Sequence, residues 1–170
     1  EFTWLAIGAS NDFLERVKSL YVAGGRKFCV DVANGHSEIC LQAVNRIKKT
    51  FPDVQIMAGC VATSEGALNL IDAGADIIRA NIGSGAACKT RVITGFGVPV
   101  LSCLEDICTT VYKKKKYSRD KIQILSDGGC RTSGDITKCL AVGASGVIVG
   151  SLLAGTDEAP GEILEDKNGK

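Results

Sequence analysis

Cys88 is the residue with the clearest chemical potential, and it lies in the glycine-studded string NIGSGAACKTR at positions 81–91. Lys89 and Arg91 lie close to it, and nearby positive charges lower the pKa of a thiol and favour the nucleophilic thiolate. Thr90, two residues further on, could share a hydrogen bond with a reacting group. A single loop cysteine is more often inert than catalytic, so this string alone leaves both interpretations open.

Two further strings could bind an anion, SDGG at 126–129 and VGS at 149–151. Each follows a β-branched apolar run. Glycine lets backbone N–H groups approach an oxyanion closely, and the start of a following helix adds positive partial charge. Asp127 suits a ribose, because a carboxylate can accept hydrogen bonds from two hydroxyls. Ordinary turn chemistry explains both strings equally well, and that alternative stays open.

The remaining candidates are backbone carbonyls and two acids. Gly83 and Gly85 can turn several carbonyls inward, where they could hold a monovalent cation, since hard cations take oxygen ligands. Asp31 ends an apolar run and Glu158 lies in the string TDEAPGE. Each acid alone is more often a helix cap or a surface charge. If both lie at one rim, they become candidates for general acid–base catalysis.

These candidates follow short apolar runs that alternate with amphipathic segments. The runs predict strands at 4–9, 27–32, 54–59, 75–80, 121–126 and 146–150. Helices are expected after Asn11 or Asp12, after Ser37, after Thr63 or Ser64, in the apolar segment before YKKKK, and from near Ser133. Between Asn81 and Pro99 no period is visible. This alternation requires parallel strands joined by right-handed crossovers, in a doubly wound sheet or a (β/α)8 barrel. In both architectures chemistry lies at the carboxyl ends of strands, where the motifs above fall.

Six strands are fewer than the eight of a closed barrel, and 170 residues are fewer than its typical ~250. The sheet is therefore either open, or about two strand–helix units belong before residue 1. No linker or change of composition divides the chain, so residues 1–170 are expected to form one domain.

Composition excludes several classes of protein. The net charge of +1 predicts no nucleic-acid partner, and the lysine run at 113–116 is interpreted as a solvated helix end. No apolar run approaches the ~20 residues of a membrane span, and no signal peptide is visible. The eight cysteines include no CxxC pair, which favours free thiols in a reducing compartment, and His36 is the only histidine, so a zinc site is not expected. Together these features predict a cytoplasmic protein.

The order and spacing of the motifs resemble one family. The string IGSGAACKTRVITGFGVP is similar to the active-site loop of the IMP dehydrogenase / GMP reductase family, which typically shows Gly-x-Gly-(Ser)-x-Cys-x-Thr followed by a TG-G-P segment. The strings SDGGCRTSGDI and GASGVIVGSLLAGTDEAPGE resemble its phosphate-binding half. The resemblance covers essentially the whole chain. It implies a (β/α)8 barrel, here an incomplete portion with about six strand–helix units, in a homotetrameric enzyme whose first two strands precede Glu1.

The resemblance also implies roles for particular residues. Cys88 resembles the nucleophile that attacks the purine C2, and Thr90 and Glu158 resemble the pair that handles protons at the 2-substituent. The implied ribose and phosphate contacts are Asp127, Gly128, Gly129, Gly150 and Ser151. The implied contacts of the nicotinamide cofactor are Asp31, Ile82 and Gly83, and the implied carbonyl ligands of a potassium ion are Gly83, Gly85 and Cys88.

Two departures from the family pattern affect the ligand pocket. The family often has serine where this chain has Ala86, so one phosphate hydrogen bond is in doubt. It often has asparagine where Cys60 stands in the string AGCVAT, so a pocket amide is in doubt.

The family contains two reactions. The strings DVANG and SDGGC favour the NADPH-dependent reduction of GMP to IMP, and GSLLAGTDEAPGE favours the NAD-dependent oxidation of IMP. The sequence analysis favours the reductase, with the dehydrogenase as the alternative. A non-catalytic nucleotide-binding module also remains open.

Overall fold

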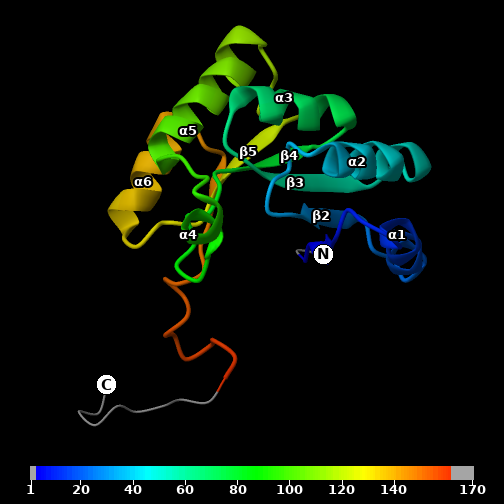
Figure 1. Ribbon diagram of the computed structural model, residues 1–170, viewed down its shortest axis with the longest axis horizontal. Helices are drawn as coiled ribbons and strands as arrows, with labels where there is room; N and C mark the ends of the chain where they lie inside the picture. Colours follow the sequence, from blue (N-terminus) through cyan, green and yellow to red (C-terminus); the bar gives the residue numbers. More distant parts are fainter. Residues whose placement is uncertain (1–2, 162–170) are drawn as a thin grey trace.

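The computed structural model describes residues 3–161, and these fold into six strands that alternate with helices (Figure 1). The strands are β1 (Leu5–Ile7), β2 (Lys27–Asp31), β3 (Gln55–Val61), β4 (Ile77–Ala80), β5 (Gln123–Asp127) and β6 (Gly146–Ile148). The helices are α1 (Phe13–Val22), α2 (Glu38–Thr50), α3 (Ser64–Ala73), α4 (Thr90–Thr94), α5 (Val100–Cys108), its π-helical continuation η1 (Thr109–Lys114) and α6 (Ser133–Val142). All six predicted strands are confirmed, with ends displaced by a few residues.

The six strands form one sheet in the order of the chain, and every neighbouring pair is parallel. A doubly wound sheet would reverse its strand order at a switch point, and this sheet does not. In Figure 1 helices α2, α3, α5 and α6 follow one another around the outer side of the sheet. The architecture is therefore part of a (β/α)8 barrel, which confirms that prediction and removes the doubly wound alternative.

Side chains alternate between the two faces of the sheet. On β2, Phe28 and Val30 are fully buried beneath the helices, whereas Cys29 and Asp31 lie on the opposite face. The same alternation buries Ile56, Ile78 and Ile124 on the neighbouring strands. The core thus lies between the sheet and its helices. The other face, which is the interior of the barrel, carries the apolar Met57, Ile77 and Leu125 as well as the polar Asp31, Arg79 and Asp127 near the carboxyl ends of the strands.

The helices begin where the sequence predicts. The hydroxyls of Ser37 and Thr63 accept hydrogen bonds from the first turns of α2 and α3, and Thr132 forms a reciprocal capping box with Asp135 at α6. Asp12 precedes α1 but makes no side-chain capping bond. The cap at α6 ties this helix to the strand-end loop before it, because Asp135 accepts from the N–H groups of Arg131 and Thr132.

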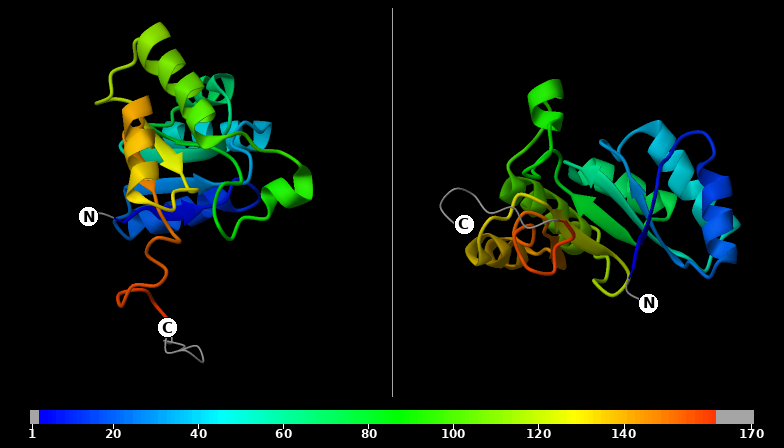
Figure 2. Two further views of the ribbon diagram at one scale, coloured as in Figure 1. Left: turned by 90° about the vertical axis from the view of Figure 1, so that its left-hand side faces the viewer. Right: turned by 90° about the horizontal axis from the view of Figure 1, so that it is seen from below.

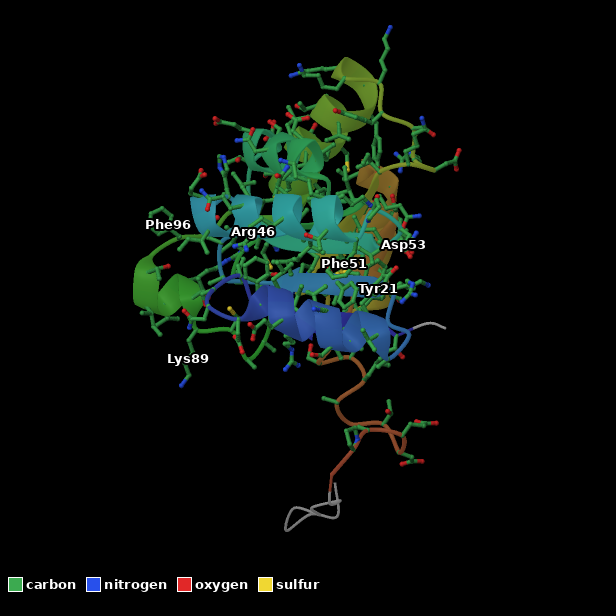
Figure 3. The ribbon with its side chains drawn as sticks, turned by 90° about the vertical axis from the view of Figure 1, so that its right-hand side faces the viewer. Tyr21, Arg46, Phe51, Asp53, Lys89 and Phe96 are labelled. Carbon is green, nitrogen blue, oxygen red and sulfur yellow. The ribbon has the colours of Figure 1, made fainter. Side chains whose placement is uncertain are left out.

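Helices α1 and α2 are joined at their surface by an aromatic cluster. The rings of Tyr21 and Phe51 lie 4.6 Å apart, and the guanidinium of Arg26 lies 3.8 Å from the Tyr21 ring. Tyr21 also donates a hydrogen bond to Asp53, and Figure 3 shows the three labelled members Tyr21, Phe51 and Asp53 together. This cluster lies at the carboxyl ends of the two helices, away from the carboxyl ends of the strands.

Residues 81–98 form an excursion that leaves β4 and returns before α5. It contains α4, which the sequence did not predict. A helix of five residues is too short to show a recognisable hydrophobic period. Figure 2 shows α4 standing clear of the sheet. Val92, Ile93 and Phe96 on this excursion are strongly exposed, and the Phe96 side chain is labelled in Figure 3.

Among residues 3–161 there is no helix with the length and apolar character needed to cross a membrane.

Candidate functional site

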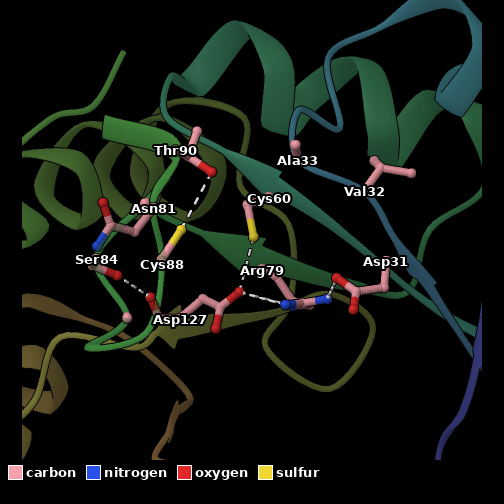
Figure 4. Close-up of a pocket in the computed structure, with 12 residues that line it drawn as sticks. Asp31, Val32, Ala33, Cys60, Arg79, Asn81, Ser84, Cys88, Thr90 and Asp127 are labelled. Atoms are coloured by element: carbon pink, nitrogen blue, oxygen red, sulfur yellow. Dashed lines mark hydrogen bonds and ion pairs between the residues drawn. The ribbon is translucent and has the colours of Figure 1, made fainter. Parts of the chain in front are cut away.

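A cavity of about 400 Å³ opens at the carboxyl ends of the strands (Figure 4). Its walls come from the end of β2, from β3 and β4, from the excursion and from the end of β5. The predicted site residues that line it are Asp31, Gly83, Gly85, Cys88, Thr90 and Asp127. Segments far apart in the sequence therefore meet here, as expected for parallel strands whose ends share one edge.

Cys88 lies exposed at this cavity and pairs with Thr90. Its Sγ lies 3.2 Å from the Thr90 Oγ1, and Figure 4 shows the two side chains facing each other. Hydrogen bonds from the hydroxyl and the backbone N–H of Thr90 lower the pKa of the Cys88 thiol. The pKa of Cys88 is therefore lowered, as the sequence predicts. The larger cause is Thr90, and the charge of Arg91 contributes less.

Arg79, on β4, organises the opposite wall of the cavity and was not singled out from the sequence. Its Nη1 lies 2.6 Å from an Asp31 oxygen, and its Nη2 and Nε lie 2.7 and 2.9 Å from Asp127 Oδ2. The side chains of Arg79 and Asp127 are only 14% and 15% exposed, so this ion pair is largely shielded from water. The available signals in the sequence were a lone arginine within an apolar strand and an aspartate at the end of two other predicted strands.

Gly59 makes this arrangement possible. In the register of the sheet, Gly59 lies between Asp31 on β2 and Arg79 on β4. A Cβ atom at residue 59 would stand 2.6 Å from the Cβ and the carbonyl oxygen of Arg79. The glycine therefore leaves the space through which the arginine reaches across β3 to Asp31.

Cys60 joins the same network from β3. Its Sγ lies 2.9 Å from Asp127 Oδ2, to which the thiol donates. Burial, followed by the negative charge of Asp127, raises the pKa of the Cys60 thiol well above its ordinary value. At residue 60 this chain thus has a protonated thiol that helps to fix Asp127. The Asp127 Oδ1 accepts no hydrogen bond within residues 3–161, so it remains available to a ligand.

A second cavity, of about 450 Å³, adjoins the first and shares Gly85 and Cys88 with it. It brings together the two strings predicted to bind an anion, Gly128–Gly129 and Gly150–Ser151. Gly128 and Gly129 both have left-handed backbones, with φ of +71° and +82°, which explains glycine at both positions. The Gly128 N–H donates to the carbonyl of Ile148, so it holds the loop to β6 in this structure. Ala86 also lines this cavity and offers no hydroxyl there.

Arg91 holds the excursion closed at its base. Its Nε donates to the Ile82 carbonyl, and its Nη2 donates to the Val98 carbonyl and to the Asn81 Oδ1. Arg91 is therefore primarily a structural clamp for the loop that carries Cys88.

Two members of the predicted site, Ile82 and Glu158, stand apart from the first two cavities. Ile82 is 9% exposed and does not line either cavity. Glu158 is exposed and lines a third cavity of about 560 Å³ with Gly150 and Leu153, away from Cys88. Asn81, which was not predicted, lines the first cavity and is buried. Its Nδ2 has no hydrogen-bond partner within the described part of the chain.

Comparison of the chain with known proteins points to one protein family. A family model described as "IMP dehydrogenase / GMP reductase domain" matches residues 3–170. Inosine-5'-monophosphate dehydrogenase from Nitrosopumilus maritimus is 52% identical over 97% of this chain and 33% of its own length.

Two solved structures are similar in fold as well as sequence. A variant GMP reductase from Trypanosoma brucei, in complex with guanosine 5'-monophosphate, has a TM-score of 0.85 and 41% identity, and the match covers 95% of this chain and 33% of that one. Inosine 5' monophosphate dehydrogenase from Legionella pneumophila has a TM-score of 0.83 and 41% identity, covering 98% of this chain and 48% of that one. The chain spans about one third of the length of the curated relatives that it matches.

Proposed function

The chain belongs to the IMP dehydrogenase / GMP reductase family, and on that premise we propose that it carries the nucleophile and the nucleotide site of an oxidoreductase acting at C2 of a purine nucleotide. One observation carries the proposal: Cys88 lies where the two cavities meet. The base would lie against Cys88, the ribose against the free oxygen of Asp127, and the phosphate in the second cavity.

Covalent catalysis by Cys88 fits its surroundings. The Cys88 thiolate would attack C2 of the purine and form a covalent adduct, which divides one difficult exchange into two easier steps. Thr90 stabilises the thiolate before attack, because its hydroxyl lies 3.2 Å from the sulfur. The same hydroxyl is within reach of a group that enters or leaves at C2. Glu158 would complete a proton relay only if its segment approached Cys88.

The carbonyls around Cys88 fit a potassium ion. Within residues 3–161, those of Gly83 and Cys88 accept no hydrogen bond, and that of Gly85 accepts one from the Cys88 N–H at 3.0 Å. A carbonyl oxygen has two lone pairs, so all three remain possible ligands. Potassium bound to these oxygens would stiffen the loop that carries the nucleophile.

Asp31 and Gly83 fit a nicotinamide cofactor better than Ile82 does. Both line the first cavity, and the Asp31 side chain is 55% exposed there and has one oxygen tied to Arg79. The other oxygen can accept from a ribose hydroxyl. Ile82 is buried and lines neither cavity, and both its N–H and its carbonyl are hydrogen-bonded within the loop, to Asn81 and Arg91. NAD, or NADP(H) for the reductase, would accept or supply the hydride.

Between the two reactions, we infer that oxidation of IMP is the better supported. The curated relatives named above and those from Aquifex aeolicus and Bacillus subtilis, at 46% and 45% identity, carry the name of the dehydrogenase. The preference for the reductase drawn from the strings DVANG and SDGGC is not confirmed. Reduction of GMP remains the second candidate, because the guanosine 5'-monophosphate complex of a GMP reductase is among the similar structures.

The deciding experiment uses the polypeptide together with any sequence that flanks it in its gene. Absorbance of the reduced nicotinamide is followed with IMP and NAD, and separately with GMP and NADPH. Formation of NADH from IMP with release of XMP is the expected result. Consumption of NADPH with release of ammonia from GMP would establish the reductase instead. Nucleotide binding with neither turnover would identify a binding module and overturn the enzymatic proposal.

A further inference from the structure

Cys130 and Cys139 form a pair of thiols that the proposed chemistry does not use. Their sulfur atoms lie 3.9 Å apart, in van der Waals contact, and both residues are buried. Cys130 follows the Gly128–Gly129 loop directly, and Cys139 lies on α6. Ser126, at the end of β5, places its hydroxyl 3.5 Å from the Cys139 sulfur.

The pair lies at the wall between two cavities. Cys130 lines the second cavity with Gly128 and Gly129, and it also lines a cavity of about 140 Å³ behind the loop. Cys139 lines this smaller cavity too. A water molecule takes roughly 30 Å³ in the liquid, so the space admits a small oxidant such as hydrogen peroxide.

We propose that Cys130 and Cys139 are an oxidisable pair, and that their disulfide pulls the Gly128–Gly129 loop out of its anion-binding position. A thiolate of the pair attacks one oxygen of hydrogen peroxide, which gives a sulfenic acid and releases hydroxide. The second thiol then displaces that oxygen as water and forms the disulfide. Two thiols lose two electrons in total, and one peroxide is reduced to two waters.

The geometry decides which partner moves. A disulfide requires the sulfurs to approach from 3.9 Å to about 2.0 Å. Cys139 lies in the middle of α6, which is fixed at its start by the capping box of Thr132 and Asp135. Cys130 lies on a loop next to two left-handed glycines. Rotation of the two side chains supplies part of this approach. Because the Arg131 N–H donates to Asp135 of α6, the remaining backbone displacement falls on Cys130 and on Gly129 beside it.

The consequence for ligand binding rests on the proposed function. If Gly129 and its neighbours hold the nucleotide phosphate, the disulfide should weaken nucleotide binding by roughly tenfold, within the usual range for coupled sites. Reciprocally, bound nucleotide should disfavour the disulfide by the same factor.

The reaction should be slow at neutral pH. Burial, followed by hydrogen bonding to Cys139, raises the pKa of Cys130 to about 11. Only the thiolate reacts, so the oxidation rate should rise about tenfold per pH unit below that value. Exposed Cys88 oxidises first, so the pair responds to sustained oxidation.

Peptide mapping tests the bond directly. Trypsin cleaves after Arg131 and Lys138, so Cys130 and Cys139 fall in separate peptides that only a disulfide can join. The chain is treated with hydrogen peroxide, blocked with an alkylating agent and digested. We expect the linked pair in the native protein and in Cys108→Ser, a buried cysteine outside the pair, and its absence in Cys139→Ser. Absence of the link in native protein, or a link from Cys130 to Cys88, would overturn the proposal.

Two further measurements test the effect on the loop. Calorimetric titration with IMP and GMP should give about tenfold weaker binding in oxidised Cys88→Ser than in the same reduced protein. Backbone hydrogen exchange of residues 127–131 should also change on oxidation. An intact disulfide with unchanged exchange would refute the loop displacement. If the reduced protein binds neither nucleotide, the proposed function is wrong. The hydrogen-exchange measurement still shows whether the disulfide displaces the loop.

Discussion

The two walls of the first cavity are built in opposite ways. The wall formed by the sheet contains Asp31, Arg79 and Asp127, whose side chains are fixed by ion pairs of 2.6 to 2.9 Å. The wall formed by the excursion carries Cys88, which is exposed and held mainly through Thr90. The comparison indicates that the binding groups are rigid before a ligand arrives, whereas the nucleophile lies on the part of the molecule that can adjust.

The largest effect should come from the nucleophile on the adjustable wall. Cys88→Ser should lower turnover by roughly a thousandfold or more, because a serine hydroxyl lacks a comparable anion at neutral pH. Nucleotide affinity should change little, since the binding groups lie elsewhere. Turnover and calorimetric titration, compared with Cys108→Ser as a control, separate the two effects. A parallel loss of affinity would mean that Cys88 also belongs to the rigid part.

The second effect tests the rigid wall. Arg79→Met should lower the free energy of unfolding by roughly 3 to 5 kcal/mol, because it leaves the largely buried Asp127 without its partner. The matched control is Asp53→Asn, which removes the exposed Arg26–Asp53 pair and should cost about 1 kcal/mol or less. Urea unfolding provides both values. Equal losses in the two variants would show that the Arg79 network is no stiffer than a surface pair.

The third effect concerns the reactivity of Cys88. Alkylation should label Cys88 before Cys60, since Thr90 lowers the pKa of Cys88 while burial and Asp127 raise that of Cys60. Thr90→Val removes the hydroxyl, so it should raise the pKa of Cys88 and move the rise in alkylation rate to higher pH. At neutral pH the variant should react up to about tenfold more slowly. An unchanged pH dependence of the alkylation rate would show that Thr90 does not lower the pKa of Cys88.

The sequence predicted the fold and the loop that carries Cys88 better than it predicted the ion pairs of the sheet wall. The strands, most helix starts and the location of Cys88, Asp127 and the glycine strings follow from local patterns, and local patterns are what a sequence displays. Arg79 was missed because its partners lie 48 residues away on either side, and only the register of the sheet brings them together. The separation of Glu158 from Cys88 depends on the path of the chain after β6, for which the sequence shows no period.

The smallest effect should come from the surface of the excursion. Phe96→Ala should change the free energy of unfolding by less than about 0.5 kcal/mol, because the residue is 74% exposed and buries little apolar surface. Thermal unfolding, with Phe28→Ala in the buried core as the contrasting variant, measures this. A loss comparable to that of the core variant would show that the excursion is packed more tightly than its exposure indicates.

The absence of a side chain at Gly59 also constrains how this protein can change over generations. Any larger residue at 59 meets the backbone of Arg79 at 2.6 Å, so the arginine could no longer cross β3. Loss of the arginine would in turn leave Asp31 and Asp127 uncompensated. Positions 31, 59, 79 and 127 should therefore vary together or stay fixed, and a lineage that replaces one of them must pass through a less stable intermediate unless the others change at the same time.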